Sequence, residues 1–219
     1  MTGADIRSGA VARPRFLTIL ATIATGAAAG ALARLLANVL APEWATLANT
    51  SALWGLVPFG IVLVLRERGW RAAAYGVLGL SSMIGVWIAS APVATARELV
   101  LWSVAGLAAG AVCGLAASGV RSASRFRRIA SAAGVAGLVA GEGLYGILLI
   151  GGPQWILELV IGFGLAVGIG VAVTPGRRVS DSGGSDRGAS DRMLALAATA
   201  LVAVACVGAY FGYDAVAVL

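Results

Sequence analysis

The chain has 219 residues, of which 59% are hydrophobic and only 12% are charged, and its mean hydropathy is +0.92. A soluble domain carries about 25% charged residues, so this chain could not cover its own surface in water and is expected to lie in lipid. Its net charge is +6, its sixteen basic residues are all arginine, and it has no lysine or histidine. These absences exclude a retinal Schiff base, a Ser–His dyad and histidine ligands to a metal or haem.

Seven apolar segments are long enough to form helices that cross the hydrocarbon core, which takes about 20 residues. The first follows Arg7, Arg13 and Arg15 and exceeds the apolar core of a signal peptide, about 7–15 residues, so we expect a retained helix. Pro58 lies inside the second segment and cannot donate a backbone hydrogen bond, which predicts a bend there. The predicted helices cover residues 16–40, 45–65, 71–91, 98–120, 129–150, 155–173 and 193–213.

The sequence therefore predicts an all-α fold, a polytopic transmembrane helix bundle of about seven helices. Its composition changes once, at residues 174–192, which are rich in Ser, Gly, Asp and Arg and almost devoid of apolar side chains. Such a segment buries too little surface to fold and is predicted to be a disordered linker. It divides the chain into an N-terminal tail (1–15), a six-helix unit (16–173), the linker (174–192) and a seventh helix with a short tail (193–219).

The arginines predict the orientation of the bundle. They gather in the N-terminal tail and in every second loop, whereas only Arg97 lies in a loop on the opposite side. Because cytoplasmic loops retain positive charge, we expect a cytoplasmic N-terminus, an external C-terminus and a multi-pass location in the cell membrane. The basic segments are short and flank apolar runs, so contact with anionic lipid explains them better than binding of nucleic acid.

Small residues at four-residue spacing predict where the helices pack, because lipid gives no hydrophobic drive for association and close backbone approach must replace it. Two interpretations of these faces stay open: packing within the chain, or a docking surface for a membrane protein partner. The glycines concerned are Gly26, Gly30, Gly106, Gly110, Gly114, Gly137 and Gly141, with a further pair at Gly164 and Gly168.

Three ionisable residues, Arg34, Glu142 and Glu158, fall inside apolar segments, where a charge is costly and tends to be paired or to face water. At 1.5 Å per residue they lie roughly 9, 12 and 5 Å from the outer ends of their helices. Opposite charges at similar depth can pair, and we expect Arg34 to pair with Glu142. Other polar and aromatic residues at this level are Asn38, Asn49, Trp54 and Tyr145.

Two interpretations of this group stay open. In the first, Arg34 and Glu142 form a structural ion pair, and the anchors at the membrane interface are Glu158, Trp44, Trp87 and Trp155. In the second, the group lines an outward-facing pocket for a small solute, with Glu142 as ligand contact or proton site. No nucleophile–base pair or metal-ligand set is visible, and the two cysteines lie singly in apolar runs. We therefore expect no enzymatic activity, no cofactor and no metal site.

The run from Asn49 to Trp54, followed by an apolar stretch and the basic loop 66–71, resembles an actinobacterial family of small polytopic membrane proteins of unknown function. The resemblance covers the first six predicted helices and implies no activity. The pairs Gly26/Gly30 and Ala27/Ala31 are similar to helix-one packing in the substrate-binding subunits of energy-coupling-factor transporters, although a seventh helix departs from that pattern. The leading hypothesis is solute binding or transport, and the alternative is a membrane scaffold or accessory subunit.

Overall fold

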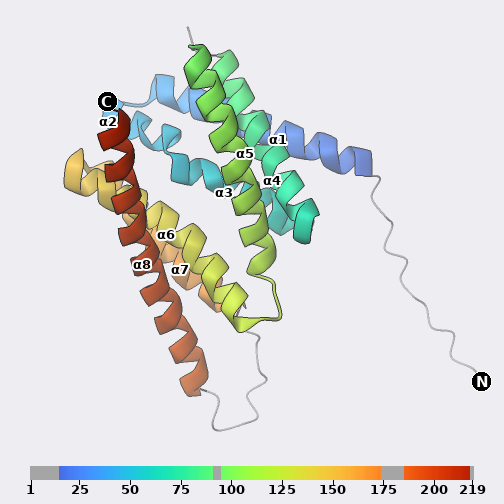
Figure 1. Ribbon diagram of the computed structural model, residues 1–219, viewed down its shortest axis with the longest axis vertical. Helices are drawn as coiled ribbons and strands as arrows, with labels where there is room; N and C mark the ends of the chain where they lie inside the picture. Colours follow the sequence, from blue (N-terminus) through green and yellow to red (C-terminus); the bar gives the residue numbers. More distant parts are fainter. Residues whose placement is uncertain (1–14, 91–94, 174–184, 218–219) are drawn as a thin grey trace, which may run out of the picture.

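The computed structural model describes residues 15–90, 95–173 and 185–217, and within them the chain is helical with no β-strand. The helices run through the chain in the order shown in Figure 1. Their bounds are α1 Arg15–Val39, α2 Pro42–Ala45, the short 3-10 helix η1 Leu47–Asn49, α3 Ser51–Leu65, α4 Gly69–Ala89, α5 Ala96–Gly119, α6 Arg125–Leu149, α7 Pro153–Val173 and α8 Ser185–Ala217.

Five helices (α1, α4, α5, α6 and α8) are long and apolar enough to cross a membrane, as a membrane protein requires. The segment from α2 to α3 is a sixth candidate if its bent halves, Pro42–Asn49 and Ser51–Leu65, count as one span. The described apolar part of α7, Pro153–Ile169, is shorter than a full span. The described residues thus hold up to six spans by length and composition, and the seventh stays a prediction.

The second predicted helix is broken, and the expected position of its bend was wrong. The two halves meet at an angle of 43° on either side of Thr50, whose backbone is extended, with φ −75° and ψ 137°. Pro58, where the sequence predicted the bend, lies buried inside the uninterrupted helix α3. The extended Thr50 ends η1 and occupies the N-cap position of α3 without a side-chain capping hydrogen bond, so the break leaves the first N–H groups of α3 to find another acceptor.

The helices form two groups. α4 packs against α1 and α5 in the first group, and α6 packs against α7 and α8 in the second, as Figure 1 shows. The broken helix α3 contacts both groups, through α4 and α5 on one side and α6 on the other. Residues at the start of α3 therefore lie where the two groups meet.

Glycines make the close helix contacts within each group. Gly26 and Gly30 face the backbone carbonyls of Gly79 and Met83, so α1 crosses α4 with no room for a side chain. Gly110 and Gly114 on α5 face α4 in the same way, and Gly106 abuts the Ile84 side chain on α4. Because backbone contact replaces side-chain interdigitation here, these crossings hold the first group together.

Helix α8 packs against α6 and α7. A Cβ on Gly137 would lie 2.6 Å from the Val202 Cβ, and one on Gly141 would lie 2.6 Å from the Cys206 Cβ. The pair Gly164 and Gly168 on α7 differs, because a Cβ at either position would meet no atom within 4 Å in the part of the chain that the structure describes. The latter pair leaves a small-residue face of α7 open.

The predicted disordered linker was partly wrong. Helix α8 begins at Ser185, so residues 185–192 of the predicted linker are helical, whereas residues 174–184 lie outside the described residues.

Arg121 contacts the C-terminal end of α3. Arg66 adopts a left-handed backbone conformation there, with φ 60°, and the Arg121 guanidinium donates to the carbonyls of Leu63 at 3.0 Å and Glu67 at 3.2 Å. The Leu63 carbonyl belongs to the last turn of α3, where carbonyls have no partner within the helix, and Glu67 follows the helix, so the guanidinium joins the end of α3 to the loop after it. Burial lowers the pKa of Arg121, and the positive charges of Arg68 and Arg66 lower this pKa further.

Candidate functional site: a polar centre at the start of helix α3

The carboxylate of Glu142, from the middle of α6, accepts the free backbone N–H groups at the start of α3. The Ala52 N–H donates to Oε2 at 2.6 Å and the Ser51 N–H to Oε1 at 3.1 Å, while the Ser51 hydroxyl lies 3.4 Å from Oε1. Helix N-termini attract anions because these N–H groups have no intrahelical partner and the helix dipole adds positive potential. Glu142 is only 7% exposed, so the interaction is shielded from water.

A second carboxylate, Glu158 from α7, lies beside the first and is fully buried. Thr50 is the polar side chain that faces it, but neither carboxylate oxygen has a hydrogen-bond partner of normal geometry among the described residues. The charge of Glu142 acts on Glu158, so the two carboxylates are neighbours. The expectation that Glu158 anchors the membrane interface was therefore wrong, because its whole side chain lies inside the bundle.

Helix α8 completes the group with a phenol and a thiol. The Tyr210 hydroxyl is directed toward Glu142 and Ser51, and Cys206 lies near the same carboxylate. The Tyr210 ring packs on Tyr145 from α6, with ring centroids 4.9 Å apart. We call the group formed by Thr50, Ser51, Ala52, Glu142, Glu158 and Tyr210 the polar centre; it draws one or more groups from each of α3, α6, α7 and α8.

The predicted ion pair between Arg34 and Glu142 does not form. The Arg34 guanidinium carbon lies over the Trp87 ring, 5.1 Å from its centroid, whereas Glu142 is bonded to the start of α3. The sequence suggested this pair because the two charges lie at similar depths. In the structure the N-terminus of α3 stabilises the carboxylate of Glu142, and the Trp87 ring stabilises the guanidinium of Arg34. Among the side chains that the structure describes, no arginine forms an ion pair with Glu142 or Glu158.

A cavity of about 250 Å³ lies next to the polar centre. It is lined by Asn49, Ser51, Trp54, Ile84, Trp87, Ile88 and Trp102, and we call it the tryptophan cavity. Trp54 and Trp87 meet edge to face with centroids 5.2 Å apart, and the Trp54 indole N–H donates to the Ala48 carbonyl across the break, at 2.9 Å. Ser51 lines this cavity and also donates to Glu142, so it connects the two.

Most of the predicted site residues lie either in or beside the polar centre or along the tryptophan cavity. Glu142 and Glu158 meet in the polar centre, Tyr145 stacks at its edge, and Asn49 and Trp54 line the tryptophan cavity. Arg34 reaches Trp87, one wall of that cavity, and Asn38 is exposed on α1.

Sequence reasoning missed Thr50, Ser51 and Tyr210 as members of the polar centre. A signal existed for the first two, because Thr and Ser directly before an apolar run are typical of a helix start. Because this helix start lies inside an apolar segment, its free N–H groups need an acceptor from elsewhere in the protein. Tyr210 carries no comparable signal, since a single tyrosine in an apolar helix fits an interfacial anchor equally well.

Residues 10–216 match a family described as "Family of unknown function (DUF6518)". The chain belongs to this family. Membership in the DUF6518 family supports the resemblance to a family of unknown function and extends it beyond six helices, since the match includes most of α8. It gives no support to an actinobacterial origin or to a likeness to energy-coupling-factor subunits. No curated protein and no solved structure matches the chain.

Proposed function

We propose that this DUF6518 protein is a multi-pass cell-membrane protein that binds a small solute from outside and exchanges a proton at Glu142 and Glu158 as it binds or moves the solute. One observation carries the proposal: two buried carboxylates from α6 and α7 meet at the start of a broken helix, and no described arginine pairs with either. Buried ionisable groups in membrane helices are costly and commonly mark ion and proton pathways.

The surroundings of the two carboxylates assign them different roles. Glu142 receives three donors from Ser51 and Ala52, which stabilise a negative charge. Glu158 receives none, and a buried ionised carboxylate without a partner is strongly disfavoured. Two neighbouring carboxylates also repel each other when both are ionised. In the proposed resting state, therefore, Glu142 is ionised and Glu158 holds the proton.

The tryptophan cavity supplies the solute site and the route for exchange. Ser51 faces the cavity and contacts Glu142, so a solute there can change the hydrogen bonding of the carboxylate that neighbours Glu158. A volume of about 250 Å³ is below that of typical pockets for drug-sized ligands, and three indole walls favour a small molecule with an apolar or aromatic face. The predicted orientation places this cavity toward the outside.

In the proposed mechanism, the helices move relative to one another at the break before α3. Broken membrane helices whose free N–H groups point at an anion occur at the sites of many secondary transporters. In this chain the free N–H groups come from α3, which contacts both helix groups, and both carboxylates come from the second group. Movement of the second group relative to α3 would therefore change the Glu142 contacts directly.

The first test measures the proposed proton. Infrared spectra of the purified protein should contain the carbonyl band of a protonated carboxylic acid buried from solvent, and this band should disappear in Glu158→Gln. Glu43→Gln is the matched control, because Glu43 is an exposed carboxylate on α2. A wild-type spectrum without the band, or a band that Glu158→Gln leaves unchanged, would refute the assignment.

The second test measures coupling to a solute. Quenching of tryptophan fluorescence is followed while small aromatic acids, amines and amino acids are added at acidic and alkaline pH. A ligand of the proposed site should quench fluorescence with an affinity that depends on pH in the wild type and loses this dependence in Glu158→Gln. A pH dependence that survives in Glu158→Gln would separate solute binding from the carboxylates.

A second candidate function is that of an accessory subunit, and the open glycine face of α7 favours it. The glycines of α1, α5 and α6 that suggested a docking surface face other helices of this chain, whereas a Cβ at Gly164 or Gly168 would meet no atom of the described residues within 4 Å. Purification in mild detergent should then retain a stoichiometric membrane protein partner that Gly164→Leu releases. Recovery of the chain alone would count against this candidate.

A further inference from the structure

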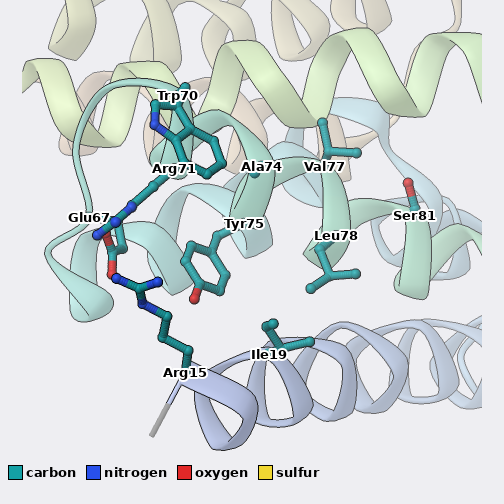
Figure 2. Close-up of a pocket in the computed structure, with 10 residues that line it drawn as sticks. All are labelled: Arg15, Ile19, Glu67, Trp70, Arg71, Ala74, Tyr75, Val77, Leu78 and Ser81. Carbon is teal, nitrogen blue, oxygen red and sulfur yellow. The ribbon is translucent and has the colours of Figure 1, made fainter. Parts of the chain in front are cut away.

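A groove between α1 and α4 lies at the arginine-rich end of the bundle, away from the polar centre. The two helices touch where Gly26 and Gly30 meet α4. Nearer the starts of both helices, larger side chains separate them and leave a volume of about 740 Å³. Figure 2 shows this α1–α4 groove with its lining residues, which are Arg15, Ile19, Glu67, Trp70, Arg71, Ala74, Tyr75, Val77, Leu78 and Ser81.

The two ends of the groove differ in chemistry. Toward the middle of the bundle its walls are mainly apolar, with Ile19 from α1 and Leu78 and Val77 from α4, and Ser81 contributes one hydroxyl. The adjoining surface of α1 is apolar as well, since Ile19 is 40%, Leu20 44% and Ile23 37% exposed. A hydrocarbon chain fits this part, because its walls continue the surface that faces lipid.

The other end of the groove carries guanidinium groups from both helices. Arg15 extends from α1 and Arg71 from α4, and Figure 2 shows both side chains reaching toward Glu67. Arg71 lies 5.7 Å from the centroid of the Trp70 ring, and Trp70 is 75% exposed. Two arginines outnumber the single acid, so this end has a net positive charge and presents donors that suit a phosphate group.

We propose that the α1–α4 groove binds an anionic glycerophospholipid, with its phosphate between Arg15 and Arg71 and one acyl chain along Ile19 and Leu78. Charge complementarity decides the class of lipid, because arginine pockets between membrane helices select anionic head groups over zwitterionic ones. Trp70, with an apolar body and a polar N–H, lies at the depth where the acyl region gives way to the head groups. The bound lipid spans the opening between the helices.

The experiment uses the full chain in neutral detergent and measures its thermal unfolding as lipid is added. Phosphatidylglycerol should raise the unfolding temperature, whereas phosphatidylcholine with the same acyl chains and inorganic phosphate should not. In the double variant Arg15→Gln/Arg71→Gln, the apparent affinity for phosphatidylglycerol should fall about 30-fold, which corresponds to about 1 kcal/mol for each arginine. Stabilisation by inorganic phosphate alone would show that the site is an anion site without a lipid chain, and would overturn the proposal.

Two further variants keep the test specific. Arg125→Gln/Arg127→Gln removes two exposed arginines from the start of α6 and should leave the effect of phosphatidylglycerol intact. Leu78→Trp fills the apolar part and keeps every charge, so it should weaken lipid binding while the response to inorganic phosphate stays absent. Equal loss of affinity in the α6 control variant, or unchanged binding by Leu78→Trp, would contradict a seated lipid. Native mass spectrometry of the same samples reports lipid retention even where a variant is less stable.

Discussion

Removing the Glu142 side chain should destabilise the bundle more than removing any other carboxylate, because it leaves the start of α3 without acceptors. In Glu142→Ala the buried Ala52 N–H loses a 2.6 Å hydrogen bond and the more exposed Ser51 N–H loses one of 3.1 Å. An unsatisfied buried donor costs about 1–3 kcal/mol and a partly exposed one about 1 kcal/mol. We expect the free energy of unfolding to fall by about 2–4 kcal/mol.

Glu142→Gln keeps one carbonyl oxygen but turns an amide N–H₂ toward the α3 donors, so it should cost about half as much as Glu142→Ala. Glu158→Gln should leave stability unchanged or raise it, because neither of its oxygens has a partner to lose. The assay is equilibrium unfolding in mixed detergent micelles, followed by circular dichroism. If Glu142→Ala costs no more than Glu158→Ala, the Glu142 carboxylate does not hold the start of α3 and the geometry of the polar centre is refuted.

Three further predictions concern packing, helix capping and topology. Gly137→Leu should unfold at a clearly lower temperature than the wild type, because the leucine side chain would collide with α8. Gly164→Leu should leave the unfolding temperature unchanged, and equal effects of the two substitutions would contradict the packing of α8. Arg121→Ala should lower the free energy of unfolding by about 1–3 kcal/mol, because two hydrogen bonds to carbonyls are lost. Chemical denaturation measures this change, and an unchanged denaturation midpoint would show that Arg121 does not cap α3. The cysteines of Arg125→Cys and Trp44→Cys should react with impermeant maleimide from opposite faces of oriented membranes. Labelling of both from one face would contradict the predicted orientation.

The helices were largely predictable from the sequence, because a membrane enforces an apolar run of fixed length and this constraint is stronger than local propensity. The observed bounds of α1 and α6 differ from the predicted ones by a few residues. A bend in the second helix was predicted at Pro58, but the break at Thr50 was not, because one extended residue leaves the apolar character of the segment unchanged.

The candidate site was predictable only in its components. Glu142 stands out as a charge in an apolar run, but its partner was sought among opposite charges. Its actual partners are backbone N–H groups 90 and 91 residues away, and such groups leave no trace in side-chain composition. Pairing by depth failed for Arg34 for a related reason: an aromatic face, here Trp87, can satisfy a guanidinium as a carboxylate does.

The long separation between the donors and their acceptor also bears on how the chain is made. When the ribosome has released α3, the residue that will accept from Ser51 and Ala52 has not yet been translated, since it comes about ninety positions later. Until α6 enters the bilayer, water or lipid head groups must satisfy the exposed amides, which keeps the start of α3 near the membrane surface. A chain truncated before α6 would therefore hold α3 in a shallow position, and the arrival of α6 would draw it into its final depth.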